Sequence, residues 1–530
     1  MNQAKFPLFL STAIPYVNAS PHVGHAFELV VADALGRHAR QRGRPVLLTG
    51  GSDDHSLKNA RAAERLGVPT HRFVAESADV FRRLPELLDV TLDEYVHTSR
   101  DARHTPAVIA LWQRCKDAGD LYQREYSGLY CTGCEAFLQE SDLLAGRCPQ
   151  HREPPEPVRE TNWFFRLSKY ETAILERLES GALRIEPLER HNEVVAFVRS
   201  GLRDFSVSRS RERARGWGIS VPSDASQVIY VWFDALTNYL TSLGFPQQTP
   251  EFERHFATAS EREHLIGKDV LRFHAVYWPA LLLSAGLSPP TSVKVHGFVT
   301  VDGEKIGKSL GNAIDPFALL ERYGVDAVRY YLLRHLHTSR DSDFRAARLI
   351  EAHDTEIVGK LGNLLQRTTA LAARHPTLNV SCQKPTAAES ELVQAAQRTL
   401  RDSVRAVDEF ALHRALASIF AFVSAANRYA DTTEPWKLSR KLLAGSEARP
   451  DDAPAQLGNV LWHLLEALRV SAVLLAPYVP RTSRQIAARL AIPELQLEDL
   501  SWARFGRWPR FFAENGSPPF RPLRARLPQS

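Results

Sequence analysis

Residues 6–40 read FPLFLSTAIPYVNASPHVGHAFELVVADALGRHAR, and the arrangement of the first part of the chain follows from them. Its mostly apolar beginning predicts a strand, the polar residues Asn18 to Pro21 predict a tight turn, and the run from His22 onward repeats apolar residues at helical spacing. Pro21 lies where a first-turn proline is tolerated, and Gly24 leaves room for a ligand beside the backbone. The stretch therefore predicts a strand, a turn and a helix in succession.

Two histidines lie one helical turn apart at the start of this helix. His22 and His25 share a face where free N–H groups and the helix dipole favour an anion, so two imidazole donors there indicate a phosphate site. The HxxH spacing leaves open the alternative of two solvated histidines.

A second stretch, residues 296–312, reads HGFVTVDGEKIGKSLGN. A β-rich run and a turn at Asp302 and Gly303 precede two lysines, Lys305 and Lys308, three positions apart. Small residues between lysines are typical of a loop that closes on a polyphosphate, where lysine supplies a point charge. An ordinary solvated basic turn is the alternative.

Together, PHVGH at 21–25 and KIGKS at 305–309 resemble the HIGH and KMSKS signatures of the class I aminoacyl-tRNA synthetases. The resemblance covers roughly the whole chain and narrows to the methionyl-tRNA synthetases, of the type with a single pair of zinc-binding knuckles. The segments that carry it are AIPYVNASPHVGH (13–25), DDH (53–55), YCTGC (130–134), YVWFDALTNYL (230–240), LIGKDVLRFHAVYWPA (265–280), KIGKSLGN (305–312) and ANRYADTTEPW (426–436). The chain departs from the family pattern at Ile306, Gly307, Ser56 and Tyr277.

Composition is that of a soluble multidomain protein. A chain of 530 residues is too long to fold around one hydrophobic core. Of its residues, 44% are apolar and 24% are charged, and the sequence predicts no membrane-spanning segment. The first strand begins at once, which argues against a signal peptide and for a cytoplasmic protein. A net charge of +5 is compatible with a polyanionic partner. Arginines crowd residues 199–215 and 504–526, either as solvated faces or as phosphate contacts.

Short apolar strands alternate with helical patterns at the start of the chain, which predicts an α/β fold with a parallel sheet and ligands at the carboxyl ends of its strands. Further strands are expected at 228–233 and 263–266, and helices at 234–243 and 270–285. The expected order is a Rossmann-like catalytic domain in two halves (1–115 and 226–295), a zinc-bearing insertion (116–225), the signature loop with a connecting domain (296–345), a helical bundle (346–492) and a tail that packs back on the body (493–530).

Four soft ligands in the insertion have the spacing of a zinc site. Cys131 and Cys134 are separated by two residues, as are Cys148 and His151, and thirteen residues lie between the pairs. Such knuckles can close a tetrahedral Zn²⁺ site, which would be structural because all four ligands come from the protein. Coincidental thiols are the alternative. Five cysteines, three of them in this segment, argue against a disulfide framework, and Cys115 and Cys382 are expected to be inert.

The resemblance implies that ATP activates methionine without a protein nucleophile, through alignment and charge stabilisation. The implied catalytic residues are His22, His25, Lys305 and Lys308. The implied ATP-binding residues are Gly24, Gly267, Asp269, Lys305, Lys308 and Ser309, with Mg²⁺ accompanying ATP. On local grounds Asp269 could equally be a helix N-cap.

The methionine pocket that the resemblance implies consists of Ile14, Tyr16, Asp53, Trp232, Ala235, Leu236, Tyr239, Val270 and His274, with Asp53 pairing the α-amino group. Aromatic walls suit a thioether, although an aromatic stripe at helical spacing also fits core packing. In the bundle, Asn363, Arg367 and Trp436 match the anticodon-reading residues of the family, consistent with stacking and hydrogen bonding to unstacked bases.

The sequence therefore predicts a methionine–tRNA ligase whose partners are ATP, L-methionine and tRNA(Met). Two alternatives are an amino-acid adenylating paralogue outside translation and a weakly catalytic tRNA-binding regulator. Retention of Asn363, Arg367 and Trp436 argues against the paralogue, and retention of both histidines and both lysines argues against the regulator. With no appended C-terminal dimerisation domain visible, we expect a monomer that binds no membrane.

Overall fold

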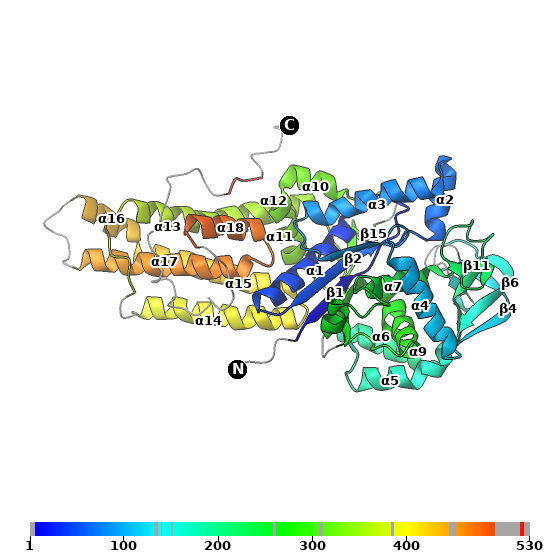
Figure 1. The fold of residues 1–530 in the computed structure, drawn as a ribbon. Coiled ribbons are helices and arrows are strands. Elements are labelled where there is room, and N and C mark those ends of the chain that lie inside the picture. The colour runs from blue at the N-terminus through cyan, green and yellow to red at the C-terminus, as the bar shows by residue number, and fades with distance from the viewer. Residues whose placement is uncertain are drawn as a thin grey trace. The chain divides into compact units, whose positions relative to one another are not determined.

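The computed structural model in Figure 1 describes residues 6–131, 136–138, 140–149, 152–257, 261–306, 311–382, 386–444, 452–492 and 520–523. The chain divides into two compact units. The first comprises residues 1–32 and 44–296, and the second comprises residues 33–43 and 297–530.

A six-stranded sheet in the order β3-β2-β1-β12-β13-β7 forms the centre of the first unit, and every neighbouring pair in it is parallel. Its strands are β1 (Leu8–Thr12), β2 (Val46–Ser52), β3 (Glu94–His97), β7 (Arg184–Glu186), β12 (Glu261–Gly267) and β13 (Ser292–His296). All five residues of β1 are buried, because a parallel sheet is covered on both faces. The predicted α/β class is confirmed.

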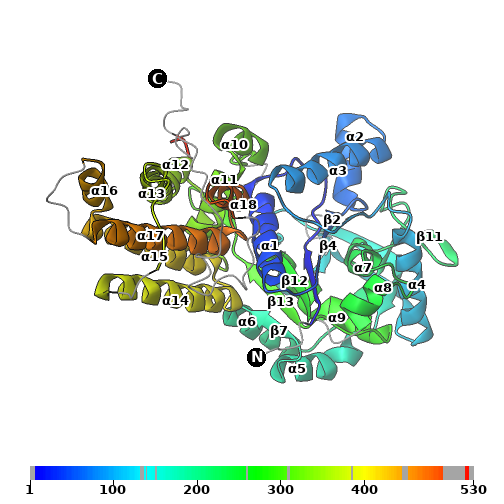
Figure 2. The ribbon, with the colours of Figure 1, turned by 60° about the vertical axis from the view of Figure 1, so that its left-hand side comes forward.

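Helices cover both faces of this sheet, with α1 on one side and α4, α7 and α9 on the other (Figures 1 and 2). Phe9 and Leu47 join the core on the side of α4, α7 and α9, where Trp112, Phe233 and Trp278 are also buried. The helices are α1 (Val23–Gln41), α2 (Leu57–Leu66), α3 (Thr70–Leu87), α4 (His104–Asp117), α5 (Glu171–Glu179), α6 (Leu188–Arg199), α7 (Val231–Thr241), α8 (Pro250–Phe252) and α9 (Trp278–Ser284).

The strand expected at 228–233 is wrong in its second half. Strand β11 (Asp224–Ile229) ends before α7 starts at Val231, and it pairs in a small antiparallel sheet with β9 (Ser208–Ser210) and β10 (Ser220–Val221) rather than in the central sheet. A short apolar run does not distinguish a buried strand from a buried helix. The helix expected at 270–285 is divided into a 3-10 turn (Lys268–Val270), a π-helical segment (Phe273–Tyr277) and α9.

The segment between α4 and α7 forms an antiparallel sheet in the order β5-β4-β6-β8. Its strands are β4 (Leu121–Cys131), β5 (Ala136–Leu138), β6 (Glu156–Phe165) and β8 (Phe205–Ser206), and short 3-10 turns span Glu140–Asp142 and Leu167–Tyr170. The same segment also supplies β7 to the edge of the central sheet.

Several arginines of the 199–215 run make contacts within the protein. Arg213 pairs with Glu160 at 2.7 Å, Arg199 pairs with Glu179 at 2.7 Å, and the Arg209 side chain is buried. Two of these three arginines therefore form ion pairs within the protein, and the third is buried in it.

The second unit combines a small sheet with a helical bundle. The sheet contains β14 (Val299–Val301), β15 (Glu304–Lys305) and β16 (Ser342–Asp343). The helices are α10 (Pro316–Tyr323), α11 (Val325–His335), α12 (Ala346–Ala352), a π-helical segment (His353–Gly362), α13 (Asn363–Ala373), α14 (Ala387–Asp408), α15 (Leu412–Thr433), α16 (Pro435–Leu443), α17 (Ala453–Leu475) and α18 (Pro480–Arg489), as Figure 2 shows.

The described part of the tail packs against this bundle. Phe520 and Leu523 are buried, and the Leu523 backbone N–H donates to the Asp354 carboxylate at 2.7 Å. Residues 493–519 and 524–530 lie outside the described residues, so for them the packing of the tail stays a prediction.

Helix α17 corrects the expectation that no segment of the chain is long and apolar enough to span a membrane. It is long and apolar enough to cross a membrane, with a mean hydropathy of 1.2 over its most apolar window, and all of that window is buried inside the protein. Within the helix, Arg469 donates two hydrogen bonds to the buried Glu466 carboxylate at 2.6 and 2.7 Å. A core helix passes the same test of length and hydropathy, and the complete burial of α17 identifies it as one.

Two adjacent glycines in β2 give a matched test of the packing. A Cβ at Gly51 would lie 2.4 Å from the Val96 carbonyl oxygen and 2.9 Å from Ile14, whereas a Cβ at Gly50 would lie 3.3 Å from the Thr12 hydroxyl. We expect Gly51→Ala to lower the free energy of unfolding by about 1–3 kcal/mol, because the β3 backbone must move. Gly50→Ala is expected to be near neutral. Equal urea midpoints for the two variants would contradict this packing.

Candidate functional site

The first unit has a topological switch point between β1 and β12. The chain leaves β1 for β2 on one side, while β12 and β13 lie on the other. The carboxyl ends of these strands lead to the turn before α1, to Asp53, to Gly267 and to His296. Ligands of open parallel sheets bind in the crevice at such a point.

The side chains of the two histidines at the start of α1 each accept a hydrogen bond from a backbone N–H of the same turn. The His22 backbone N–H donates to Nδ1 of His25 at 3.0 Å, the Gly24 N–H donates to Nδ1 of His22 at 3.1 Å, and the rings stack with their centroids 3.9 Å apart. This arrangement is a capping box made of imidazoles. Because a backbone N–H only donates, each Nδ1 accepts, and each neutral ring carries its hydrogen on Nε2.

This geometry corrects two expectations. The N–H of Gly24 donates to His22, and the N–H of His25 donates to the His22 carbonyl at 2.9 Å, so these two groups are not free for an anion. A Cβ at Gly24 would lie 2.9 Å from the His22 ring, so the missing side chain admits that ring. The remaining hydrogen-bond donor atom of each imidazole is therefore Nε2.

Two residues that sequence reasoning missed adjoin this pair. Nε2 of His296, at the end of β13, lies 2.8 Å from the Glu28 carboxylate, and Glu28 follows His25 by three positions in α1. Burial, together with the charges of His22 and His296, holds the pKa of His25 well below its usual value. Burial raises the pKa of Glu28 against the opposing effect of His296. The helical spacing of Glu28 was the available signal.

The structure brings together most of the expected amino-acid pocket. Tyr16 forms a β-bridge with Asp53, and the Tyr16 ring meets the Trp232 ring edge-on at 6.4 Å. The Tyr239 hydroxyl lies 2.8 Å from Nε2 of His274, whose ring centroid lies 6.5 Å from that of Trp232. These aromatic side chains therefore lie close to one another, and Tyr239 is part of the hydrophobic core against which Trp232 packs.

The other expected members lie around this group. Val270 contributes its carbonyl, which lies 3.0 Å from Nδ1 of His274, and Ile14 lies close to Gly51. Ala235 and Leu236 are buried in the core, 4% and 2% exposed, and Leu236 belongs to the same core cluster as Tyr239.

The structure describes only some of the residues that are expected to bind ATP. Gly267 caps the 3-10 turn at the end of β12, which makes Asp269 the second residue of that turn and excludes it as the N-cap. Asp269 is exposed at this edge of the sheet. Lys305, in the second unit, lies with its ammonium 4.2 Å from the centroid of the Phe298 ring. Lys308 and Ser309 lie outside the described residues.

Two of the four expected zinc ligands are described. The Cys131 and Cys148 side chains are buried, and the Arg152 N–H donates to the Cys148 carbonyl at 2.8 Å. Cys134 and His151 lie outside the described residues. No group of three metal ligands occurs among the residues that the structure describes, which include only half of this set.

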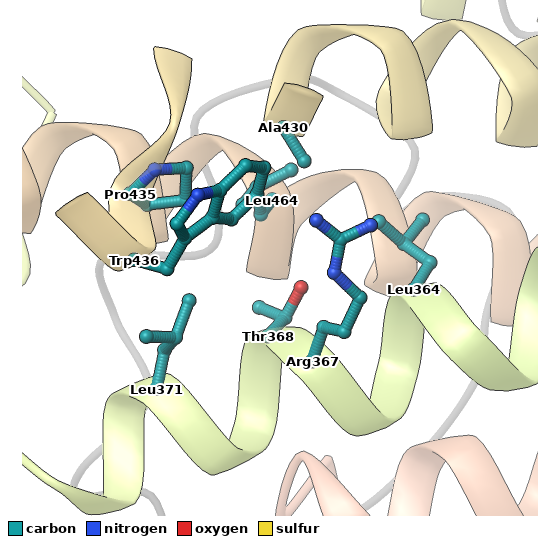
Figure 3. A pocket seen from close by; sticks show the side chains of 8 residues that line it. All are labelled: Leu364, Arg367, Thr368, Leu371, Ala430, Pro435, Trp436 and Leu464. Atoms are coloured by element: carbon teal, nitrogen blue, oxygen red, sulfur yellow. The ribbon is translucent and has the colours of Figure 1, made fainter. Parts of the chain in front are cut away.

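A pocket in the bundle contains two of the three residues expected to read an anticodon (Figure 3). Glu434 is the C-cap of helix α15 and is left-handed with φ 43°, and Pro435 then starts α16. Trp436 thereby lies with its ring 4.6 Å from the Arg367 guanidinium, which also donates to Asp431 at 3.2 Å. The lining consists of Leu364, Arg367, Thr368, Leu371, Ala430, Pro435, Trp436 and Leu464. Asn363 is outside this lining, one helical turn before Arg367.

Known proteins match this chain over nearly its whole length. The family model "tRNA synthetases class I (M)" matches residues 8–154 and 151–369. A methionine–tRNA ligase of Brucella suis is 39% identical over 500 residues, which are 93% of each chain. One from Nostoc is 39% identical over 495 residues, 92% of this chain and 91% of that one. The Mycobacterium tuberculosis methionyl-tRNA synthetase in complex with methionyl-adenylate is 35% identical, covers 98% of this chain and 99% of its own, and has a TM-score of 0.88.

The hydrogen bonds of His274 predict its protonation. The Val270 carbonyl only accepts, so Nδ1 carries the hydrogen and Nε2 accepts from Tyr239. Burial lowers the pKa of His274 to about 4. We expect ¹⁵N spectra of histidine-labelled protein to show a neutral, Nδ1-protonated ring between pH 5 and 8, with the signal assigned through His274→Gln.

The same pKa shift has a consequence for stability. The pKa of His274 is lower in the folded protein than in the unfolded chain, so folding favours the neutral ring. The resulting contribution to the free energy of unfolding is complete above pH 6.5 and is lost as the pH falls toward 4. Over this range, the free energy of unfolding changes with pH by at most roughly 1.4 kcal/mol per pH unit through this group. A ring that titrates near pH 6.5 in the folded protein would contradict the assignment.

Proposed function

Because this chain belongs to the class I methionyl-tRNA synthetases and is a methionine–tRNA ligase, we propose that the groups gathered at the switch point activate L-methionine. The enzyme joins methionine to ATP as methionyl-adenylate and transfers the methionyl group to tRNA(Met). The family, fold class and enzyme class predicted from the sequence are confirmed. The paralogue and the regulator receive no support, since the relatives match along the helical bundle as well.

The mutual cap of His22 and His25 is the observation that carries the catalytic assignment. It directs two neutral Nε2–H donors away from the helix, where they can stabilise charge on the α-phosphate as the methionine carboxylate attacks and pyrophosphate leaves. Lys305, Lys308 and Ser309 are assigned to the phosphates, Gly267 to the close approach of ATP, and Asp269 to its ribose. Mg²⁺ bound to ATP would supply positive charge to the pyrophosphate, beside the lysines assigned to the phosphates.

The amino-acid site is assigned to the pocket around Trp232. Asp53 pairs the α-amino group, Tyr16, Trp232, Tyr239 and His274 surround the thioether side chain, and Ile14 and Val270 add apolar surface. Ala235 and Leu236 support this wall from the core. A neutral His274 whose Nε2 accepts from Tyr239 presents no charge to the sulfur, which favours a soft apolar side chain.

The pocket of Arg367 and Trp436 is assigned to the anticodon, with Asn363 beside it. The indole offers a face on which an unstacked base can stack, and the guanidinium offers hydrogen-bond donors to its edge. The same surface would admit an aromatic ligand of another kind, but an aromatic and an arginine together match the chemistry of an unpaired nucleotide.

Loss of either group should weaken charging without affecting activation. We expect Trp436→Ala and Arg367→Ala each to raise the KM for tRNA(Met) by about 5- to 150-fold, corresponding to roughly 1–3 kcal/mol for one stacked base. ATP–pyrophosphate exchange should be unchanged, because no tRNA takes part in it. The control is Arg405→Ala, which removes an exposed arginine of α14. An equal rise in the control, or a fall in exchange, would refute the anticodon assignment.

A single structural zinc is assigned to Cys131, Cys134, Cys148 and His151. Two buried thiols suit a soft, closed tetrahedral site. The metal would supply no catalytic chemistry and would hold together an antiparallel insertion with little core of its own. We further propose a cytoplasmic enzyme, on the basis of its composition and its family.

The zinc assignment makes a measurable prediction. Cys131→Ser should lose the metal and lower the melting temperature, because the site contributes folding free energy. Cys115→Ser is the matched control, since that buried thiol contacts the Leu281 carbonyl instead and should leave zinc bound. Elemental analysis by mass spectrometry of protein purified without chelators measures both. An absence of zinc in the unmodified enzyme would disprove the site.

A further inference from the structure

A buried carboxylate bridges two histidines beside the methionine pocket. Oδ2 of Asp234 lies 2.7 Å from Nδ1 of His55, and Oδ1 lies 2.6 Å from Nε2 of His104. Asp234 is 1% exposed and His104 is fully buried, while the His55 side chain is 10% exposed. Nδ1 of His104 lies 2.8 Å from the Thr241 hydroxyl, which continues the network along α7.

This carboxylate joins three separate elements. Asp234 belongs to the first turns of α7, the helix that also carries Trp232 and Tyr239. His104 is the first residue of α4. His55 follows Asp53 by two positions in the turn after β2, so one side chain connects the wall of the pocket with the turn that carries the proposed amino-group ligand.

The turn itself is held firmly on its other sides. The Asp54 carboxylate accepts from the N–H and hydroxyl of Ser99 at 3.1 and 2.7 Å. The Asp54 carbonyl accepts from the Trp217 indole at 2.7 Å and from Asn59 at 2.9 Å. With its backbone fixed in this way, the position of the turn relative to α7 depends directly on the His55–Asp234 hydrogen bond.

The charges of Asp234 and His55 favour the hydrogen bond between them. Burial alone would raise the pKa of Asp234, but the charge of His55 and hydrogen bonds from both histidines lower it well below its usual range. Burial likewise opposes the charged form of His55, yet the attraction of Asp234 raises the pKa of His55 overall. An ionised carboxylate between two ring N–H groups is a strong, charge-assisted link.

We propose that Asp234 is a positioning residue for methionine activation, which sets the spacing between Asp53 and the pocket wall of Trp232 and Tyr239. This inference rests on the proposed methionine site. Asp234 acts through His55 and His104 and need not touch the substrate. A small change in spacing at such a site lowers the rate strongly, because the bound amino acid must meet the α-phosphate in a narrow range of geometries.

The test is the kinetics of ATP–pyrophosphate exchange by the full-length enzyme carrying Asp234→Asn. Asparagine keeps the size of the side chain but removes the charge and one of the two acceptors. We expect kcat/KM for methionine to fall by about tenfold or more, as a shift of the order of 1 Å can produce, while the KM for ATP changes less than about twofold. A second variant, His55→Phe, removes only the donor and keeps a ring beside Trp217, so it should show the same selective loss and serves if Asp234→Asn fails to fold.

Asp120→Asn is the matched control for lost stability. Asp120 is also fully buried in the first unit and accepts from Lys169 at 2.7 Å, from Ser284 at 2.8 Å and from Tyr170, but it lies away from the proposed pocket residues. It should lower the melting temperature and leave kcat/KM for methionine unchanged. If it causes the same methionine-specific loss, the effect is one of general stability and the inference fails.

Asp53→Asn separates the inference from the site on which it rests. If Asp53→Asn leaves the KM for methionine unchanged, the assignment of the methionine site is wrong. If Asp53→Asn raises that KM but folded Asp234→Asn and His55→Phe do not lower kcat/KM for methionine, the site stands and the positioning role is refuted. Selective loss in all three variants, with an unaffected Asp120→Asn, supports the proposal.

Discussion

Strand β1 is hydrogen-bonded on both sides, and the site depends on this constraint. The pairing continues past the end of the strand, because the Ala13 N–H donates to Leu265 of β12 at 3.1 Å and the Asp53 N–H donates to Pro15 at 2.9 Å. The chain between Ala13 and Tyr16 is therefore positioned by β12 on one side and by the turn after β2 on the other. Tyr16 and Asp53 are neighbours for this reason, and α1 starts at a fixed place a few residues later.

The histidine cap limits how this helix terminus can bind an anion. Each Nδ1 accepts a backbone hydrogen, so protonation of either ring would break one of the two cap bonds. Burial and the neighbouring histidines oppose that protonation at His25 by lowering its pKa. The rings are thus neutral donors in fixed directions, and cationic charge for the phosphates is assigned to the lysines of the second signature. In this proposal, two elements distant in sequence divide the roles of orientation and charge.

Local patterns in the sequence predicted the strand, turn and helix at residues 6–40, the alternating α/β order and the helical bundle, because each rests on periodicity and turn chemistry over a short range. They failed at residues 228–233, where an apolar run without a clear period fits a strand and a helix equally well. Most residues of the amino-acid pocket came from the family resemblance. The pocket of Arg367 and Trp436 was also reached in this way, and its structural cause, the left-handed Glu434 before Pro435, has no clear sequence signal.

The link between Asp234, His55 and His104 could not be found from the sequence alone. The hydrogen-bonded partners lie 179 and 130 positions apart, and no local spacing connects an aspartate in a helix with histidines in a turn and at another helix start. Glu28 and His296 present the same difficulty, since one belongs to α1 and the other ends β13. Contacts of this kind depend on the order of strands in the sheet, which brings distant chain segments to one edge.

The buried pair in α17 has a consequence for the sorting of the newly made chain. Before the bundle forms, this helix presents 23 residues with the length and mean hydropathy of a bilayer-spanning segment. Glu466 and Arg469 lie in its middle, and acidic and basic side chains at the centre of such a segment disfavour insertion, by roughly 2.5–3.5 kcal/mol for an arginine. In the folded bundle the two charges satisfy each other through two hydrogen bonds. The same pair therefore disfavours partition of the helix into lipid and is accommodated in the protein core.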